Sequence, residues 1–206
     1  MTPALARLLA DVRSCTVCTA SLPLGPRPVV QIGARASILV IGQAPSSRVH
    51  ETGVPWNDSS GARLREWMGV DAATFYDSER VATMAMGFCY PGASKTGGDK
   101  PPRRECAPLW HERLRAHMAE VRLTLLVGSY AQRAYLKAAS KQSLTEAVRN
   151  FEQFLPGFLP LPHPSWRSTG WMRRNPWFEA EALPMLRESV ASALRHYGNG
   201  GRESPA

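Results

Sequence analysis

Four short apolar runs, separated by amphipathic stretches, constrain the fold of this chain most strongly. They occupy residues 37–41, 81–86, 123–127 and 158–161, and a glycine or a proline follows each of them. Continuous apolar runs of this length are typical of strands that are buried on both faces of a parallel sheet. We therefore predict an α/β fold, a single-domain three-layer α/β/α arrangement with a central, mainly parallel four-stranded sheet.

Helical periodicity occupies the stretches around these runs. It predicts helices over residues 3–14, 62–68, 108–121, 129–137 and 175–197. The sequence contains no internal repeat and no clear domain boundary, and 206 residues with 44% hydrophobic content suit one compact core. We expect a single domain over residues 1–197 and a flexible tail over residues 198–206.

The charge of the chain indicates the kind of partner it binds. The formal net charge is +8 at pH 7. A surplus of this size favours a polyanion, with nucleic acid first and an anionic membrane second. No segment reads as a secretory signal or as a bilayer span, so we expect a cytoplasmic location and no membrane partner. Nothing in the sequence reads as a dimer interface, so we also expect a monomer.

The four cysteines form two pairs along the chain. Cys15 and Cys18 make a Cys-x-x-Cys turn, and Cys89 and Cys106 flank a loop rich in proline and glycine. Two such pairs can complete a tetrahedral set of thiolates around zinc or a [4Fe–4S] cluster. The wide second spacing favours the iron–sulfur cluster over zinc. Ordinary burial of the cysteines as small hydrophobic residues is the alternative.

Three loops leave the carboxyl ends of predicted strands, at Gly42, Gly87 and Pro162. Ligands of open parallel sheets bind beyond these ends, so we expect the three loops to converge on one crevice. In the first loop, Gly42 allows close backbone approach and Pro45 fixes a turn. Further along this loop, Trp56 follows a proline and provides a platform on which a base can stack.

The last loop is basic and aromatic. His163-Pro164-Ser165 follows the fourth run, and the segment then carries Trp166, Arg167, Trp171, Arg173 and Arg174. Cationic and aromatic side chains in one loop suit phosphates and unstacked bases. His163, which stands at a strand end, is a candidate functional residue.

Taken in order, these motifs resemble the family-4-type iron–sulfur enzymes of the uracil-DNA glycosylase superfamily. The resemblance extends from Cys15 to about Pro176. It includes the four cysteines, the His-Pro-Ser motif, and the spacing of the two glycines and two prolines in the first loop: Gly42, Pro45, Gly53 and Pro55.

The resemblance implies a role for each matching residue. Gln43 and Ala44 would line a uracil pocket, Trp56 would stack on the flipped base, and His163 would hydrogen-bond uracil O2. Ser165 would hold a phosphate, and Trp166 and Arg167 would enter the space that the flipped nucleotide leaves. The substrate-binding set is Gly42, Gln43, Ala44, Pro45, Trp56 and Asn57. The DNA-binding set is Ser165, Trp166, Arg167, Arg173 and Arg174. The cluster ligands are Cys15, Cys18, Cys89 and Cys106.

The chain departs from the family pattern at its acidic and amide positions. Gln43 stands where glutamate is usual, and Ala44 stands where related enzymes place a water-activating aspartate. Ala85 stands where the family has a uracil-reading asparagine. As substitutes for the carboxylate we consider His50, Glu51 and Asp58, and for reading the base edge Asn57.

The resemblance implies a DNA repair glycosylase that hydrolyses the N-glycosidic bond of uracil and leaves an abasic site. Two alternatives stay open because the loop acid and the asparagine are replaced. One is a glycosylase for another deaminated base, such as hypoxanthine or xanthine. The other is a non-catalytic binder of abasic or single-stranded DNA.

Overall fold

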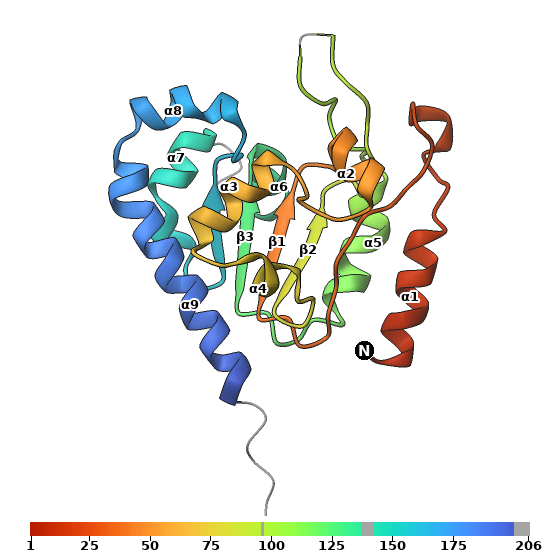
Figure 1. Cartoon of the computed structure of the whole chain (residues 1–206), viewed down its shortest axis with the longest axis horizontal. Coiled ribbons are helices and arrows are strands. Elements are labelled where there is room, and N and C mark those ends of the chain that lie inside the picture. The colour runs from red at the N-terminus through yellow and green to blue at the C-terminus, as the bar shows by residue number, and fades with distance from the viewer. Residues whose placement is uncertain (96, 137–141, 200–206) are drawn as a thin grey trace, which may run out of the picture.

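A parallel sheet of four strands, in the order β2-β1-β3-β4, forms the centre of the molecule (Figure 1). The computed structural model describes residues 1–95, 97–136 and 142–199, the last four of them by their backbone only. The strands confirm the four predicted runs to within one residue at each end. They are β1 (Ile38–Gly42), β2 (Val81–Ala85), β3 (Leu123–Val127) and β4 (Phe158–Leu161).

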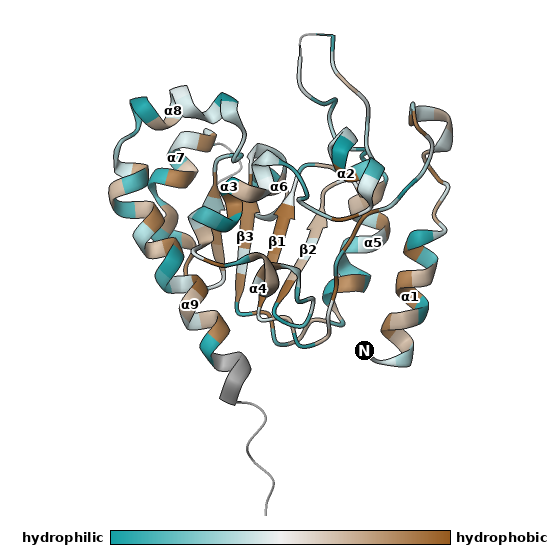
Figure 2. Ribbon diagram, viewed as in Figure 1, coloured by the Kyte–Doolittle hydropathy of each residue, from teal (hydrophilic) through white to brown (hydrophobic). Residues whose placement is uncertain are grey.

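Helices cover both faces of the sheet, which confirms the predicted three-layer architecture. In β1, Ile38 and Val40 pack into one hydrophobic cluster, and Leu39 and Ile41 pack into the other. Figure 2 shows the apolar strands between helices that carry hydrophilic residues on their outer surfaces. The first cluster is covered by α3 (Ser59–Met68), α4 (Ala72–Tyr76), α7 (Leu144–Arg149) and α9 (Leu183–Asn199), and the second by α1 (Pro3–Arg13), α5 (Cys106–Arg115) and α6 (Ser129–Tyr135).

Several of the predicted helices have other bounds in the structure. The helix predicted over residues 129–137 is α6, which ends at Tyr135, and residue 137 lies outside the described residues. The helix predicted over residues 108–121 ends at Arg115, because the amide of His117 donates to the carbonyl of Leu114 (3.0 Å) in a turn that leads the chain into β3. The helix predicted from residue 175 begins as a π-helical turn, η5 (Phe178–Ala182), and continues as α9. α9 runs to Asn199, inside the expected tail, and residues 200–206 lie outside the described residues.

Several short helices were not predicted. Two of them, α2 (Ser47–Thr52) and α8 (Thr169–Arg174), lie in segments that the sequence indicated as loops. Helices of six residues are too short to establish a periodicity, and local capping defines them instead. At α2, for example, the Ser46 hydroxyl accepts a hydrogen bond from the amide of Val49 (3.3 Å). Among the described residues, α4 and α7 were not predicted either, nor were the single turns η1 (Thr19–Ser21), η3 (Phe151–Phe154) and η4 (Trp166–Ser168).

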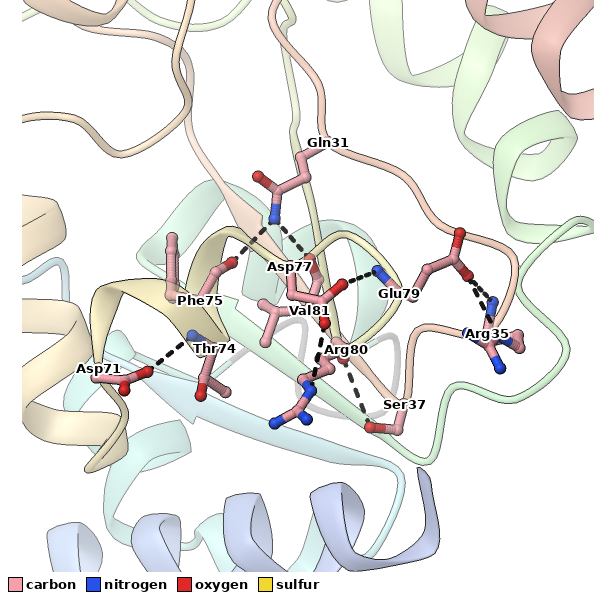
Figure 3. Close-up of polar contacts among 10 residues, drawn as sticks. All are labelled: Gln31, Arg35, Ser37, Asp71, Thr74, Phe75, Asp77, Glu79, Arg80 and Val81. Carbon is pink, nitrogen blue, oxygen red and sulfur yellow. Dashed lines mark hydrogen bonds and ion pairs between the residues drawn. The ribbon is translucent and has the colours of Figure 1, made fainter. Parts of the chain in front are cut away.

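Polar contacts fix the turn that enters β2 at the amino edge of the sheet (Figure 3). The Gln31 amide donates to the carbonyls of Phe75 (2.9 Å) and Val81 (2.7 Å). Asp77 accepts from the amide of Glu79 (3.0 Å). These side chains already form hydrogen bonds within the protein. The carboxyl edge of the sheet, at its opposite end, is the one available for a ligand. Of the helices in the described part of the chain, none is long and apolar enough to cross a membrane.

Candidate active site

A cavity of about 400 Å³ opens at the carboxyl edge of the sheet. Its volume lies within the range of about 300–1,000 Å³ that is usual for small-molecule sites. The loops after β1, β2 and β4 all contribute to its lining, which confirms their predicted convergence. The lining residues used below are Gly42, Gln43, Ala44, Pro45, Ser46, Val49, Trp56, Asp58, Thr83, Ala85, Gly97, Gly98, Asp99, His163, Ser165, Trp166 and Arg167.

Trp56 forms one wall, and its position explains two glycines. Its φ of 56° lies in the left-handed region, which is uncommon for a bulky residue. A Cβ atom at Gly42 would lie 2.8 Å from Cζ2 of the Trp56 ring, and one at Gly61 would lie 1.7 Å from the Trp56 carbonyl oxygen. The Tyr76 hydroxyl donates to that same carbonyl (3.3 Å). The indole ring is therefore held across the end of β1.

His163 faces Trp56 from the end of β4. The two ring centroids are 6.0 Å apart, and the planes are inclined by 31°. Burial lowers the pKa of His163 below the usual 6.5, and the charge of Asp58 opposes this shift only in part. The imidazole is therefore neutral at neutral pH, with one N–H donor. The Ser168 hydroxyl donates to the His163 carbonyl (2.5 Å) and holds the loop behind the ring.

Asp58 lies in the cavity and joins the beginnings of two helices. Its Oδ1 accepts from the amide of Gly61 (2.9 Å), which caps α3. Its Oδ2 accepts from the hydroxyl of Ser46 (2.7 Å), and Ser46 in turn caps α2. Both carboxylate oxygens are thus already engaged by the protein, so Asp58 has a structural task in addition to lining the cavity.

The other candidates from the first loop divide into two groups. Gln43, Ala44 and Pro45 line the cavity, whereas His50, Glu51 and Asn57 are not among its lining residues. Helix α2 explains part of this division, because it presents Val49 to the cavity and successive residues of a helix point in directions about 100° apart. Glu51 is exposed.

The predicted DNA-binding residues lie at or near the mouth of the cavity. Ser165, Trp166 and Arg167 line it, and the Trp166 side chain is 74% exposed. The guanidinium carbon of Arg167 lies 5.4 Å from the centre of the Trp166 ring. Arg173 and Arg174 are exposed on α8, which lies at the same edge of the sheet in Figure 1, outside the cavity lining.

The lining residues that the sequence reasoning missed include Asp99 and Thr83. Asp99 belongs to a segment whose many prolines and glycines suggested only a loop. Thr83 belongs to an apolar strand, where the one hydroxyl was the available signal. The structure buries Thr83 to 1% exposure and leaves its Oγ1 without a hydrogen-bond partner.

The four cysteines line a second pocket, away from the cavity, together with Leu22, Phe88, Arg103 and Trp110. Burial raises the pKa of the Cys89 thiol to about 11 and that of Cys106 to about 12. Nε of Arg103 is buried there without a hydrogen-bond partner. Within the described residues, no three His, Cys, Asp or Glu side chains are arranged to hold a metal ion as they stand.

The family described as the uracil DNA glycosylase superfamily has a model that matches residues 30–187. Among solved structures, the chain is similar to a candidate uracil DNA glycosylase from Methanosarcina acetivorans, determined by solution NMR. The two are 16% identical with a TM-score of 0.42, and the match covers 78% of this chain and 94% of the other. These values are too low for the second match to inform the site.

Proposed function

Because this chain belongs to the uracil DNA glycosylase superfamily, we propose that it is a DNA repair enzyme that hydrolyses the N-glycosidic bond of uracil and leaves an abasic site. The observation that carries the proposal is the pair formed by Trp56 and a neutral His163 across one cavity. A base that is turned out of the DNA stack needs an aromatic face to lie against and polar groups at its edge.

His163 supplies the donor that the chemistry requires. Breaking the bond between C1′ and the base nitrogen leaves positive charge on the sugar and negative charge on the departing base. The N–H of His163 donates a hydrogen bond to the base oxygen on which this charge develops. A donor that is fixed before the reaction stabilises the transition state without reorganisation, which is the principle of an oxyanion hole. Trp56 holds the base in plane during this step.

The surface around the cavity suits the DNA strand. Ser165 and Arg167 stand where a phosphate would pass, and the exposed Trp166 ring is placed to fill the space of the flipped nucleotide. Arg173 and Arg174 extend the positive charge along α8. The net charge of +8 adds long-range attraction to a polyanion.

We also propose that Cys15, Cys18, Cys89 and Cys106 hold a [4Fe–4S] cluster. The four cysteines line one pocket, and the wide spacing of Cys89 and Cys106 along the chain favours a cluster in which each thiolate binds a different iron. The unpaired N–H of Arg103 suits the sulfur atoms of an anionic cluster.

Four thiolate ligands leave no open coordination site, so the cluster's contribution is structural. It would connect the end of α1 to the loop that carries Cys89 and to the beginning of α5. Zinc is the alternative occupant.

A glycosylase for hypoxanthine or xanthine is the second candidate function. The observation that favours it is the wall of the cavity formed by β2, where Thr83 and Ala85 present no amide group. An amide that matches the uracil edge is therefore missing from the position where the family places it.

The proposed function is tested by base release from single-stranded oligonucleotides that contain one uracil, one hypoxanthine or one xanthine. We expect the wild-type protein to release uracil, and we expect His163→Ala to slow this release roughly 100- to 1,000-fold, as the loss of an oxyanion donor does. His117→Ala is the matched control, because His117 lies beyond the end of α5 and outside the cavity lining.

Each outcome separates the candidates. Release of a purine base in place of uracil would establish the second function. DNA binding without release of any base would identify a non-catalytic binder. Equal rates for His163→Ala and the wild type would remove His163 from the mechanism.

A further inference from the structure

An antiparallel hairpin, of which the structure describes residues 92–95 and 97–100, carries Asp99 to the cavity. Asp99 pairs with Ala93 in an antiparallel bridge, and the amide of Lys100 donates to the carbonyl of Gly92 (2.8 Å). In Figure 1 this hairpin projects beyond the carboxyl edge of the sheet. Nε2 of Gln43 donates to the Lys100 carbonyl (3.1 Å) and anchors the hairpin to the loop after β1. The backbone thus determines where Asp99 lies relative to the cavity.

Arg167 docks on this hairpin beside Asp99. A Cβ atom at Gly97 would lie 2.8 Å from Nη2 of Arg167, and one at Gly98 would lie 2.7 Å from Nη1. A side chain at either position would require the guanidinium group to move away, and both glycines also have positive φ angles, 88° and 80°. The loop after β4 and the hairpin after β2 therefore meet through Arg167 at the mouth of the cavity.

The two aspartates of the cavity differ in what engages them. Both oxygens of Asp58 accept hydrogen bonds from the protein, from Gly61 and from Ser46. Asp99 is exposed at the cavity mouth, so its carboxylate is reachable by water and substrate. A proton on Asp58 would disturb the hydrogen bonds that cap α3 and hold Ser46. Asp99 can accept a proton from a ligand without disturbing a helix cap.

The charges that face Asp99 come from two other segments, from Asp58 at the beginning of α3 and from Arg167 in η4. The uncharged hydroxyl of Tyr90 also lies near, and burial together with the charge of Asp99 raises its pKa. The cavity walls shield the carboxyl group from part of the solvent although it is exposed at the mouth, and this desolvation raises the pKa of Asp99. Asp58 raises it further, and Arg167 lowers it. A carboxylate with a raised pKa is a better general base.

We propose that Asp99 orients the attacking water and accepts its proton, in place of the aspartate that Ala44 replaces. The inference rests on the proposed function. The bond between C1′ and the base nitrogen breaks with its electron pair on the base, and the water oxygen bonds to C1′. One water proton passes to Asp99, which returns it to the solvent. The base anion is held by His163 and takes a proton from the solvent after it leaves.

The test compares the wild-type protein with Asp99→Asn and with Glu120→Gln. Glu120 is an exposed residue before β3, at the opposite edge of the sheet, and its substitution removes the same charge. Base release from a single-stranded uracil oligonucleotide is measured under single-turnover conditions between pH 5 and pH 9. Binding is measured with an oligonucleotide in which a 2′-fluorine slows cleavage, because fluorine destabilises the cationic sugar.

We expect Asp99→Asn to lower the single-turnover rate roughly 100- to 1,000-fold, the usual contribution of a general base. Its binding constant should stay within about threefold of the wild type, because the residue acts on water. The wild-type rate should fall at acidic pH as Asp99 takes up a proton, and Asp99→Asn should lose this part of the profile. Glu120→Gln should keep both the rate and the profile.

A wild-type protein that releases uracil, together with an Asp99→Asn variant within about threefold of its rate, would overturn this inference and leave the proposed function standing. A variant that loses DNA binding as strongly as rate would also overturn it, because Asp99 would then act through binding. A wild-type protein that releases no base would overturn the proposed function and this inference together.

Discussion

The hydroxyl group of Thr83 is buried at the cavity wall without a hydrogen-bond partner. A buried hydroxyl without a hydrogen-bond partner destabilises the folded protein. A ligand that forms the missing hydrogen bond removes this penalty in the complex. We expect Thr83→Val, which keeps the shape and removes the hydroxyl, to lower kcat/KM for base release about tenfold, the effect of one lost hydrogen bond. The free energy of unfolding, measured with urea, should stay equal or rise.

Thr124→Val is the matched control for this change. Thr124 is a buried threonine of β3 that does not line the cavity. If both variants keep the wild-type kcat/KM, Thr83 has no contact with the substrate.

At the scale of elements, the four cysteines line one pocket between the end of α1, the loop after β2 and the beginning of α5. Helix α1 packs on the sheet through Leu5, Leu8, Leu9 and Val12, and the proposed cluster adds a second attachment at its end. We expect Cys15→Ala to lose iron and to lower the melting temperature by roughly 10 °C. Loss of a structural metal centre costs more than most substitutions, and about 1 kcal/mol corresponds to about 2–4 °C in a protein of this size.

The measurement combines iron analysis with thermal unfolding of protein that was purified without oxygen. Ser14→Ala, which changes the exposed neighbouring residue, should keep both properties of the wild type. Wild-type iron content in Cys15→Ala would contradict the proposed ligand set, and zinc in the wild-type protein would contradict the proposed cluster.

At the scale of the whole molecule, two histidines, the buried His111 and the partly buried His163, make stability depend on pH. Burial lowers the pKa of both His111 and His163 below the usual 6.5. Nε2 of His111 lies 2.9 Å from the Ala85 carbonyl and Nδ1 lies 2.6 Å from the Tyr135 hydroxyl. Since a carbonyl only accepts, the neutral ring donates through Nε2 and accepts through Nδ1.

The unfolded chain therefore binds protons at these two positions more readily than the folded protein does. This contribution to stability is complete above about pH 6.5 and is lost as the pH falls below it, by up to about 1.4 kcal/mol per pH unit for each histidine. Urea unfolding at pH 7.5, 6.5 and 5.5 measures the loss. His111→Gln should show about half of the slope. A free energy of unfolding that stays constant over this interval would contradict the prediction.

Much of the fold could be predicted from the sequence, because its signals are local. The apolar runs identified four strands, and the amphipathic stretch at residues 3–14 identified α1. The short helix α2 escaped prediction because its six residues are defined by a cap at Ser46. In the site, Trp56 and His163 stood out by their motifs, and the structure places both in the cavity. His50 and Glu51 came from the same loop, but α2 directs them elsewhere.

The sequence by itself thus determined where the four strands and the longer helices lie along the chain, the basic charge and the loops that follow each strand. Only the tertiary structure decided which side chains share the cavity. Asp58, Thr83, Asp99 and His163 come from four separate segments. They meet because parallel strands bring their carboxyl ends to one edge, and because the hairpin that follows β2 holds Asp99 at the same edge. This proximity depends on the register of the sheet, on the glycines beside Trp56 and Arg167, and on backbone hydrogen bonds between segments that are distant in the sequence. No local sequence pattern encodes such long-range contacts.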